Sequence, residues 1–298
     1  MSVLTQQPAT PGRIAALARS VEQHPGISKD DLINLMLLTR GSTNQIVVPP
    51  AIADGNDDGQ DDGQDGSPAA QAAENGRDGL QTALNVAIDL RVVAEHEGGH
   101  RLDTGLGGTS REVMLDWLVP RLVVPATAAR HQQSEVPRAV AWLLEQQPRQ
   151  PLSLNAGVPD RALALPNATR FQQFAYWAQY IGVARWIGLP GVTAGFLIPD
   201  PSHLVRRALR AALQVGVRVP LRLLPDLWAS DFPVLDGGSL RQPPATRDGV
   251  RLSPTTSLAL LHLMQTTEFA LHDDADADSV TLQIGNQPMR FSHIERLN

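Results

Sequence analysis

Apolar residues in the first hundred positions recur at helical spacing in three segments and then alternate with polar ones, as in strands. A first helix is expected over residues 12–21, and Pro25-Gly26 ends it. Ser28 is the expected N-cap of a second helix, whose apolar stripe consists of Leu32, Leu35, Met36 and Leu38. A third helix over 79–90 precedes two short strands, 92–95 and 100–103, around a turn. Three helices followed by a hairpin predict a winged helix.

The middle of the chain repeats the succession of a helix and short strands. Ser110 is the expected N-cap of a helix over 111–119, which Pro120 should end, and a second helix is expected over 136–147. A longer helix over 170–181 carries aromatic residues at helical spacing, and a hairpin of residues 183–187 and 195–198 follows it. With a further helix from Pro201 to Leu213, this segment resembles a second winged helix.

The C-terminal part has the same order. Ser253 is the expected cap of a helix that has Pro254 at its first position. Residues 268–272 and 279–284 are expected to form a hairpin around an acidic turn, and residues 290–294 add a third strand. The pattern therefore predicts a third helix followed by a wing.

These patterns predict a chain that is mainly α with small β-hairpins, an α+β fold of tandem winged-helix-like domains. Residues 1–106 are the expected N-terminal winged helix, 107–240 a middle helical and winged-helix-like domain, and 241–298 a C-terminal winged-helix-like domain. Residues 52–77 form an acidic insert in the first domain, rich in Asp, Gly, Gln and Ala. Such a composition buries too little apolar surface to order itself, so this insert is expected to be disordered.

The net charge of −6 conceals an uneven distribution. Six aspartates of the insert account for all of it: Asp54, Asp57, Asp58, Asp61, Asp62 and Asp65. Between residues 161 and 222, eight arginines stand against a single acidic residue, Asp200. The middle of the chain is therefore basic, and nucleic acid stays open as a partner in spite of the overall charge.

Candidate DNA contacts lie on the third helix and on the hairpin that follows it. Gln81 and Asn85 are four residues apart and share a helical face, and their amides suit the edges of adenine in the major groove. The other candidates are basic side chains and a histidine that could hold the backbone: Arg77, Arg91, His100 and Arg101. In the middle domain Arg206, Arg207 and Arg210 lie on or near one face of their helix and form the best candidate for a phosphate-binding patch.

The sequence predicts no catalytic residues, no metal site and no cofactor, and hence a protein that is not an enzyme. Residues 54–65 match calcium-loop positions but end in Asp where the bidentate Glu belongs, so a solvated acidic segment is the better interpretation. There is no cysteine, and the histidines are mostly isolated. Lys29 is the only lysine, which excludes a lysine-dependent nuclease core. The chain has neither a secretory leader nor an apolar run near the length of a membrane span, so a cytoplasmic protein without membrane contact is expected.

Several longer motifs carry a resemblance to a known family. They are Phe171-Gln-Gln-Phe174-Ala-Tyr-Trp177 with Gly182, Ile198-Pro-Asp-Pro201, Pro233-Val-Leu-Asp-Gly-Gly238 and Leu252-Ser-Pro254. Together with the split winged helix at the N-terminus, they resemble DpdG, an accessory protein of bacterial systems that place 7-deazaguanine derivatives in DNA and restrict unmodified DNA. The resemblance implies a non-enzymatic component of a phage-defence or DNA-modification assembly, and it transfers no catalytic residues.

Two functions remain open at this point. The leading hypothesis is a protein that binds double-stranded DNA and recruits other subunits of a modification and restriction system. The alternative is a protein-interaction scaffold whose winged helices bind a helicase or nuclease partner and not DNA.

Overall fold

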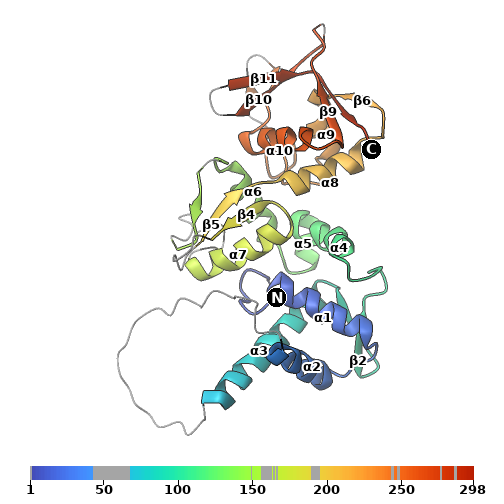
Figure 1. Cartoon of the computed structure of the whole chain (residues 1–298), viewed down its shortest axis with the longest axis vertical. Helices are drawn as coiled ribbons and strands as arrows, with labels where there is room; N and C mark the ends of the chain where they lie inside the picture. The colour runs from blue at the N-terminus through green and yellow to red at the C-terminus, as the bar shows by residue number, and fades with distance from the viewer. Residues whose placement is uncertain are drawn as a thin grey trace. The chain divides into compact units, whose positions relative to one another are not determined.

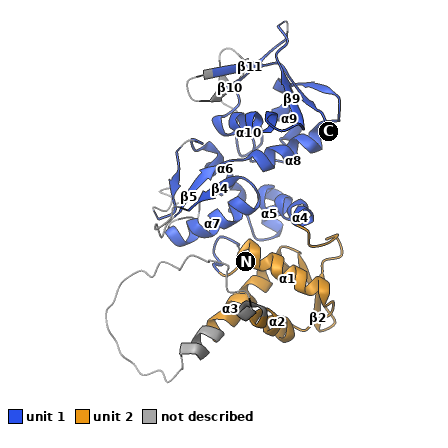
Figure 2. Cartoon of the chain, viewed as in Figure 1, with its two compact units in different colours: residues 1–7, 111–189, 194–298 blue, residues 8–110, 190–193 orange. Residues whose placement is uncertain are grey.

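The computed structural model describes residues 2–42, 68–148, 150–155, 163, 165, 167–188, 195–242, 245–246, 249–275, 277–284 and 287–298. The fold is a mixture of α-helices and small antiparallel sheets (Figure 1), which confirms the expected combination of helices and hairpins. The chain divides into two compact units (Figure 2). Unit 1 comprises residues 1–7, 111–189 and 194–298, and unit 2 comprises residues 8–110 and 190–193. The three-domain division stays a prediction.

Unit 2 contains three helices and a hairpin in the predicted order. They are α1 Pro11–Gln23, α2 Lys29–Ser42, α3 Pro68–Asp89, β1 Val93–His96 and β2 Gly99–Leu102. The Thr10 side chain caps α1 by accepting a hydrogen bond from the N–H of Arg13. Ser28 caps α2 as predicted, since its hydroxyl oxygen accepts from the N–H of Asp31 at 3.2 Å. The core lies where the three helices meet.

Two predictions for unit 2 are wrong. Residues 68–77 were expected to be disordered, but α3 already begins at Pro68, because proline suits a first helical position and Ala, Gln and Glu favour helix. Leu38 was expected in the buried stripe of α2 but is 74% exposed, while Leu32 and Ile33 are buried. The first turns of α2 supply its buried side chains. The Asp-rich segment 54–65 lies outside the described residues.

The hairpin of unit 2 closes into a small sheet through a residue between α1 and α2. β1 and β2 are antiparallel, and the turn residues Glu97 and Gly98 both have positive φ, 43° and 84°, as a two-residue type I′ turn requires. Ile27 forms an antiparallel bridge with His100 on β2. The order across the sheet is therefore Ile27, β2, β1.

The first half of unit 1 contains α4 Arg111–Val123, α5 Pro125–Arg130, α6 Val136–Glu145, β3 Leu152–Ser153, α7 Ala168–Tyr180, β4 Ala184–Ile187 and β5 Phe196–Pro199. Asn167 caps α7, whose Phe171, Phe174 and Trp177 form the aromatic core that was predicted. The prediction that Pro120 ends its helix is wrong, because α4 continues to Val123. Pro120 is exposed, so its ring meets solvent, and the buried Leu118, Leu122 and Val123 hold the helix on both sides of it.

The second half of unit 1 contains α8 Ser202–Ala212, β6 Arg218–Pro220, the 3₁₀ turn η2 Leu221–Leu223, α9 Leu224–Trp228, β7 Ala245–Thr246, β8 Gly249–Val250, α10 Pro254–Met264, β9 Phe269–His272, β10 Val280–Ile284, β11 Gln287–Phe291 and β12 His293–Arg296. The predicted hairpin of β9 with β10 is wrong. β10 pairs with β11, so β12 becomes the partner of β9 and also pairs with β6.

One arrangement of strands recurs three times along the chain. The orders are Ile27–β2–β1, β3–β5–β4 and β6–β12–β9, so that the earliest segment always pairs with the last strand. In each case the residue after the last strand donates its N–H to the carbonyl of the residue before the first hairpin strand. These bonds join Asp103 to Val92 at 3.2 Å, Asp200 to Val183 at 3.0 Å and Leu297 to Glu268 at 2.8 Å.

The helices that precede the first two hairpins also end alike. The N–H of Val92 bonds the carbonyl of Ala87, and the N–H of Val183 bonds the carbonyl of Ala178, both at 2.9 Å. The residue at the end of each helix, Arg91 or Gly182, has a positive φ of 57° or 78°. The two hairpins therefore leave their helices with the same geometry.

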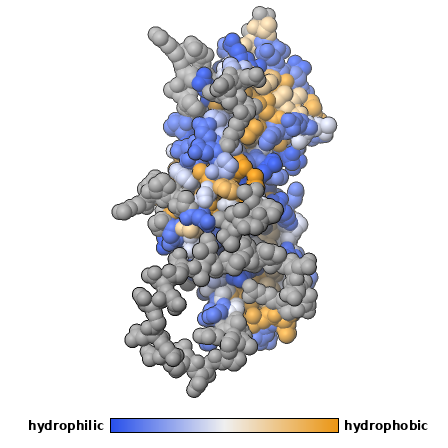
Figure 3. Space-filling model, turned by 60° about the vertical axis from the view of Figure 1, so that its left-hand side comes forward, coloured by the Kyte–Doolittle hydropathy of each residue, from blue (hydrophilic) through white to orange (hydrophobic). Residues whose placement is uncertain are grey.

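The surface carries few large apolar side chains among the described residues. Those at least 37% exposed are Leu38, Ile187, Val215, Val217, Leu223, Leu227, Met289 and Leu297. Figure 3 shows hydrophobic surface at the level of the C-terminal sheet, surrounded by hydrophilic side chains. No described helix combines the length and the apolarity that crossing a membrane requires.

Replacing Gly99 tests the three-stranded closure of unit 2. A β-carbon at Gly99 would overlap the backbone carbonyl of Gly26, which lies beside the Ile27 bridge. We expect Gly99→Ala to lower the free energy of unfolding by about 1–3 kcal/mol, measured by urea denaturation. Gly107→Ala is the matched control, because nothing lies within 4 Å of its β-carbon. Equal stability of the two variants would contradict the close approach.

Candidate functional site

The candidate residues of α3 form one line along the helix. Arg77 is exposed and forms an ion pair with Asp30 of α2 at 2.8 Å. Gln81 and Asn85 are partly buried, and the side-chain N–H of Gln81 donates to the side-chain oxygen of Asn85 at 2.8 Å. This bond leaves the pair with the Gln81 carbonyl and the Asn85 amide as hydrogen-bonding groups for a partner. The structure therefore brings these three side chains together on one face.

The hairpin presents fewer cations than expected. Arg91 and Arg101 are exposed, but His100 is 5% exposed and its Nδ1 lies 3.4 Å from the carbonyl of Ile27. The tip of the hairpin instead exposes Glu95, His96 and Glu97. A phosphate would meet two carboxylates at this tip, so Arg91 and Arg101 are the basic side chains that the hairpin offers.

The three arginines of α8 are all engaged with carboxylates. Arg206 and Arg210 both bind Glu268, which precedes β9, and the Arg206–Glu268 ion pair measures 3.3 Å. The hydrogen bond that Arg210 donates to Glu268 raises the pKa of Arg210 further. Arg207 binds Asp116 of α4. A phosphate would compete with these carboxylates for the guanidinium groups.

The charge of the two units differs in sign. Residues 8–110 contain fifteen acidic and seven basic side chains, while residues 111–298 contain sixteen acidic and eighteen basic ones. Unit 2, which carries the α3 face, is therefore the acidic part of the chain.

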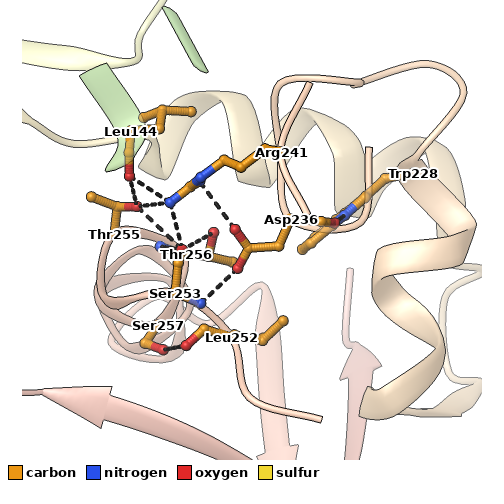
Figure 4. Close-up of polar contacts among 9 residues, drawn as sticks. All are labelled: Leu144, Trp228, Asp236, Arg241, Leu252, Ser253, Thr255, Thr256 and Ser257. Atoms are coloured by element: carbon orange, nitrogen blue, oxygen red, sulfur yellow. Dashed lines mark hydrogen bonds and ion pairs between the residues drawn. The ribbon is translucent and has the colours of Figure 1, made fainter. Parts of the chain in front are cut away.

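A buried polar network joins two segments that are distant in sequence (Figure 4). The carboxylate of Asp236 forms an ion pair with Arg241 at 3.1 Å and accepts from the N–H of Ser253 at 2.7 Å. Arg241 also donates to the hydroxyl oxygens of Ser253 and Thr255, both at 2.7 Å, and to the carbonyl of Leu144 at the end of α6. Asp236 is fully buried and Arg241 is 4% exposed. Burial lowers the pKa of the Arg241 guanidinium, and the charge of Asp236 opposes that effect.

Two glycines allow the loop before Arg241 to fold this tightly. Gly237 has a φ of 90°, which L side chains rarely adopt, and a β-carbon at Gly238 would overlap the backbone of Pro233. The indole N–H of Trp228 donates to the carbonyl of Asp236 at 2.7 Å. The motifs 233–238 and 252–254 are therefore two halves of one network, which the sequence did not reveal because no spacing rule links Asp236 to Ser253.

A second polar cluster lies at the start of α8. Asp200 accepts hydrogen bonds from the N–H of Ser202 at 3.1 Å and from its hydroxyl, and it forms an ion pair with Arg185. Burial raises the pKa of Asp200, but the bonds from Ser202 and the charge of Arg185 outweigh it, so the net shift is downward. His262 Nδ1 lies 3.4 Å from the Ser202 hydroxyl. The carboxylate contacts the serine and not the histidine, which is not the order of a charge-relay triad.

No group of three or more His, Asp or Glu side chains suited to a metal ion occurs among the residues that the structure describes.

A family model described as DpdG-like matches residues 1–277. The chain belongs to the DpdG-like family. Membership of this family supports a part in a Dpd-type modification system. No curated protein and no solved structure matches the chain.

The Asp236–Arg241 pair makes a prediction about the stability of this DpdG-like chain. Arg241→Met leaves the Asp236 carboxylate buried without its cation, so we expect a loss of about 3–5 kcal/mol in the free energy of unfolding, measured by urea denaturation. The double variant Asp236→Asn/Arg241→Met removes both charges and should cost less than the sum of the single variants. Additive costs would contradict a direct interaction between the two side chains.

Asp200 makes a prediction about pH. Because the folded state lowers its pKa, Asp200 stabilises the fold above the pKa of the unfolded chain, about 3.9, and this contribution is lost as the pH falls through the folded value. We expect Asp200→Asn to cost about 1–3 kcal/mol at neutral pH and progressively less below about pH 4. Urea denaturation of both proteins over a pH series measures this difference, and a difference independent of pH would exclude the assignment.

Proposed function

We propose that this DpdG-like chain is a non-catalytic recruiting subunit of a Dpd-type DNA-modification and restriction system, built from three winged-helix modules that bind protein. The observation that carries the proposal is the strand arrangement that recurs three times, each time closed by a hydrogen bond between equivalent backbone groups. In a winged helix, a short strand before the second helix pairs with the last strand of the wing, and this is the order seen in each repeat.

The strand pairings define the limits of the three proposed modules. The first runs from α1 to β2, the second from α6 through β3 and α7 to β5, and the third from α8 through β6 and α10 to β12. In the third, β10 and β11 extend the wing as a hairpin of their own. The third module thus begins at α8, earlier than the boundary at residue 241 expected from the sequence, because β6 pairs with β12.

Charge favours a protein partner over DNA. The tip of the wing that follows α3 exposes Glu95 and Glu97, and Arg77 of α3 is already paired with Asp30. Binding to a DNA backbone depends on cations that neutralise phosphates. Since the arginines of α8 already bind Glu268 and Asp116, a phosphate would have to share them with these carboxylates.

Ser202 supports a role without catalysis. Its hydroxyl is bound to Asp200 at the first turn of α8, where both groups act on the start of the helix. This arrangement organises the backbone at the start of the helix, and the carboxylate contacts the serine directly and does not orient His262, as it would in a charge-relay triad.

Double-stranded DNA is the second candidate, favoured by the line of Arg77, Gln81 and Asn85 on α3 with Arg101 exposed on the wing. The amide pair keeps hydrogen-bonding groups for a base edge, and the two arginines are placed to hold a backbone.

Co-purification tests the leading proposal. The full chain is co-expressed with the other proteins of its Dpd-type system, and we expect a stable complex that the double variant Gln81→Ala/Asn85→Ala reduces by about tenfold or more in affinity. Gln179→Ala, an exposed polar residue of α7, is the matched control and should leave the complex intact. A complex insensitive to the double variant, or no complex at all, would refute docking through α3.

A gel-shift series with double-stranded DNA separates the two candidates. Protein docking predicts no shifted band at physiological salt, about 0.15 M. If DNA is the partner, binding weakens steeply as salt rises and is lost in Gln81→Ala/Asn85→Ala but not in Gln179→Ala. That result would contradict the proposed protein partner and support double-stranded DNA as the ligand of the α3 face.

A further inference from the structure

A second exposed surface lies in unit 1, whereas α3 belongs to unit 2. Three aliphatic side chains are unusually exposed there: Val215 at 55%, Val217 at 44% and Leu297 at 46%. Figure 1 shows α8, β6 and the C-terminal end of the chain on the same side of this unit. We call these residues, with Arg210, Arg218 and Arg296, the 215–297 surface.

Backbone contacts hold these residues together. Val215 forms a β-bridge with Arg296, and the N–H of Gly216 donates to the carbonyl of Arg296 at 2.7 Å. The guanidinium of Arg296 in turn donates to the carbonyls of Arg210, at 3.2 Å, and Asn298, at 2.9 Å. Leu297 is bonded through its N–H to the carbonyl of Glu268. These contacts place residues 210, 215, 216, 296 and 297 next to one another, and Val217 and Arg218 follow directly along the chain.

The surface presents positive charge outward although its arginines have carboxylate partners. Arg210 binds Glu268 and Arg218 binds Glu295, the latter at 3.2 Å. The carboxylate side chains are only 12% and 18% exposed, whereas the two arginine side chains are 48% and 54% exposed. Glu268 is also shared with Arg206, and Glu295 with His272. The carboxylates lie beneath and the guanidinium groups face solvent, each with N–H donors to spare.

We propose that the 215–297 surface binds a protein segment that combines aliphatic and acidic side chains. Aliphatic residues of the segment would cover Val215, Val217 and Leu297, and its carboxylates would accept from Arg210, Arg218 and Arg296. The exposed apolar residues are aliphatic, so they offer no aromatic ring on which a nucleic-acid base could stack. This inference goes beyond the proposed function, because it assigns a second interface, in another unit, with a partner of defined chemistry.

An unbiased peptide selection tests this assignment. The full chain is used to select binders from a displayed library of random peptides, and selected peptides are measured by fluorescence anisotropy. We expect a class enriched in Asp or Glu together with Leu, Ile or Val. Val217→Asp and Arg218→Glu should each weaken binding of that class by about tenfold or more.

Controls keep folding and charge effects apart. Arg138→Glu reverses an exposed charge on α6, and Leu38→Asp changes an exposed aliphatic residue of α2, and neither should affect the peptides. Val215→Ser replaces Val217→Asp if the latter lowers the melting temperature. Selection of basic peptides, displacement of the peptides by double-stranded DNA, or a class indifferent to Val215, Val217 and Arg218 would each overturn the assignment. Peptides dependent on Gln81 and Asn85 would instead report on the α3 face.

Discussion

The ion pair between Asp236 and Arg241 is the interaction on which unit 1 depends. It joins the end of α6, the loop 233–241 and the first turn of α10, three segments with no contiguous sequence. In the proposed modules, α6 is the first helix of the second winged helix and α10 is the last helix of the third. A buried charge pair is costly, and here Ser253, Thr255 and Leu144 offset part of that cost by accepting hydrogen bonds from Nη2 of Arg241, while Nη1 faces Asp236 in the ion pair. The network thus fastens α6 to α10 inside unit 1.

Each proposed module solves the same problem with little material. Strands of two to five residues are too short to form a stable hairpin alone, so each sheet needs a third segment and a helix to cover it. The bridge at Ile27, and strands β3 and β6, supply that segment. The backbone hydrogen bond after the last strand then joins the end of the hairpin to the residue that precedes its first strand. The two ends of the wing are therefore held together.

Charge separates the surfaces of this DpdG-like chain by what they can bind. We propose that the α3 face, which offers an amide pair beside a wing that exposes Glu95 and Glu97, binds a protein and not a DNA backbone. The 215–297 surface has its carboxylates beneath and its arginines outward, which suits an acidic and aliphatic segment. A subunit with two surfaces of different chemistry can hold two partners at once, which is the physical requirement for recruitment.

Local patterns in the sequence determined most of the helices, several caps and the first two hairpins, because these depend on residues close together along the chain. Ser28 and Ser253 cap helices as expected, and the aromatic residues of α7 form a core. The sequence also placed Gln81 and Asn85 on one face of α3, and the structure added Arg77, because α3 begins earlier than expected. Only the tertiary structure decided which strands pair, that Leu38 is exposed, that His100 is buried, and that Asp236, Arg241 and Ser253 meet. These depend on contacts between distant segments, whose free energy no local spacing encodes. For the same reason the arginines of α8 look free in the sequence but bind Glu268 and Asp116 in the fold.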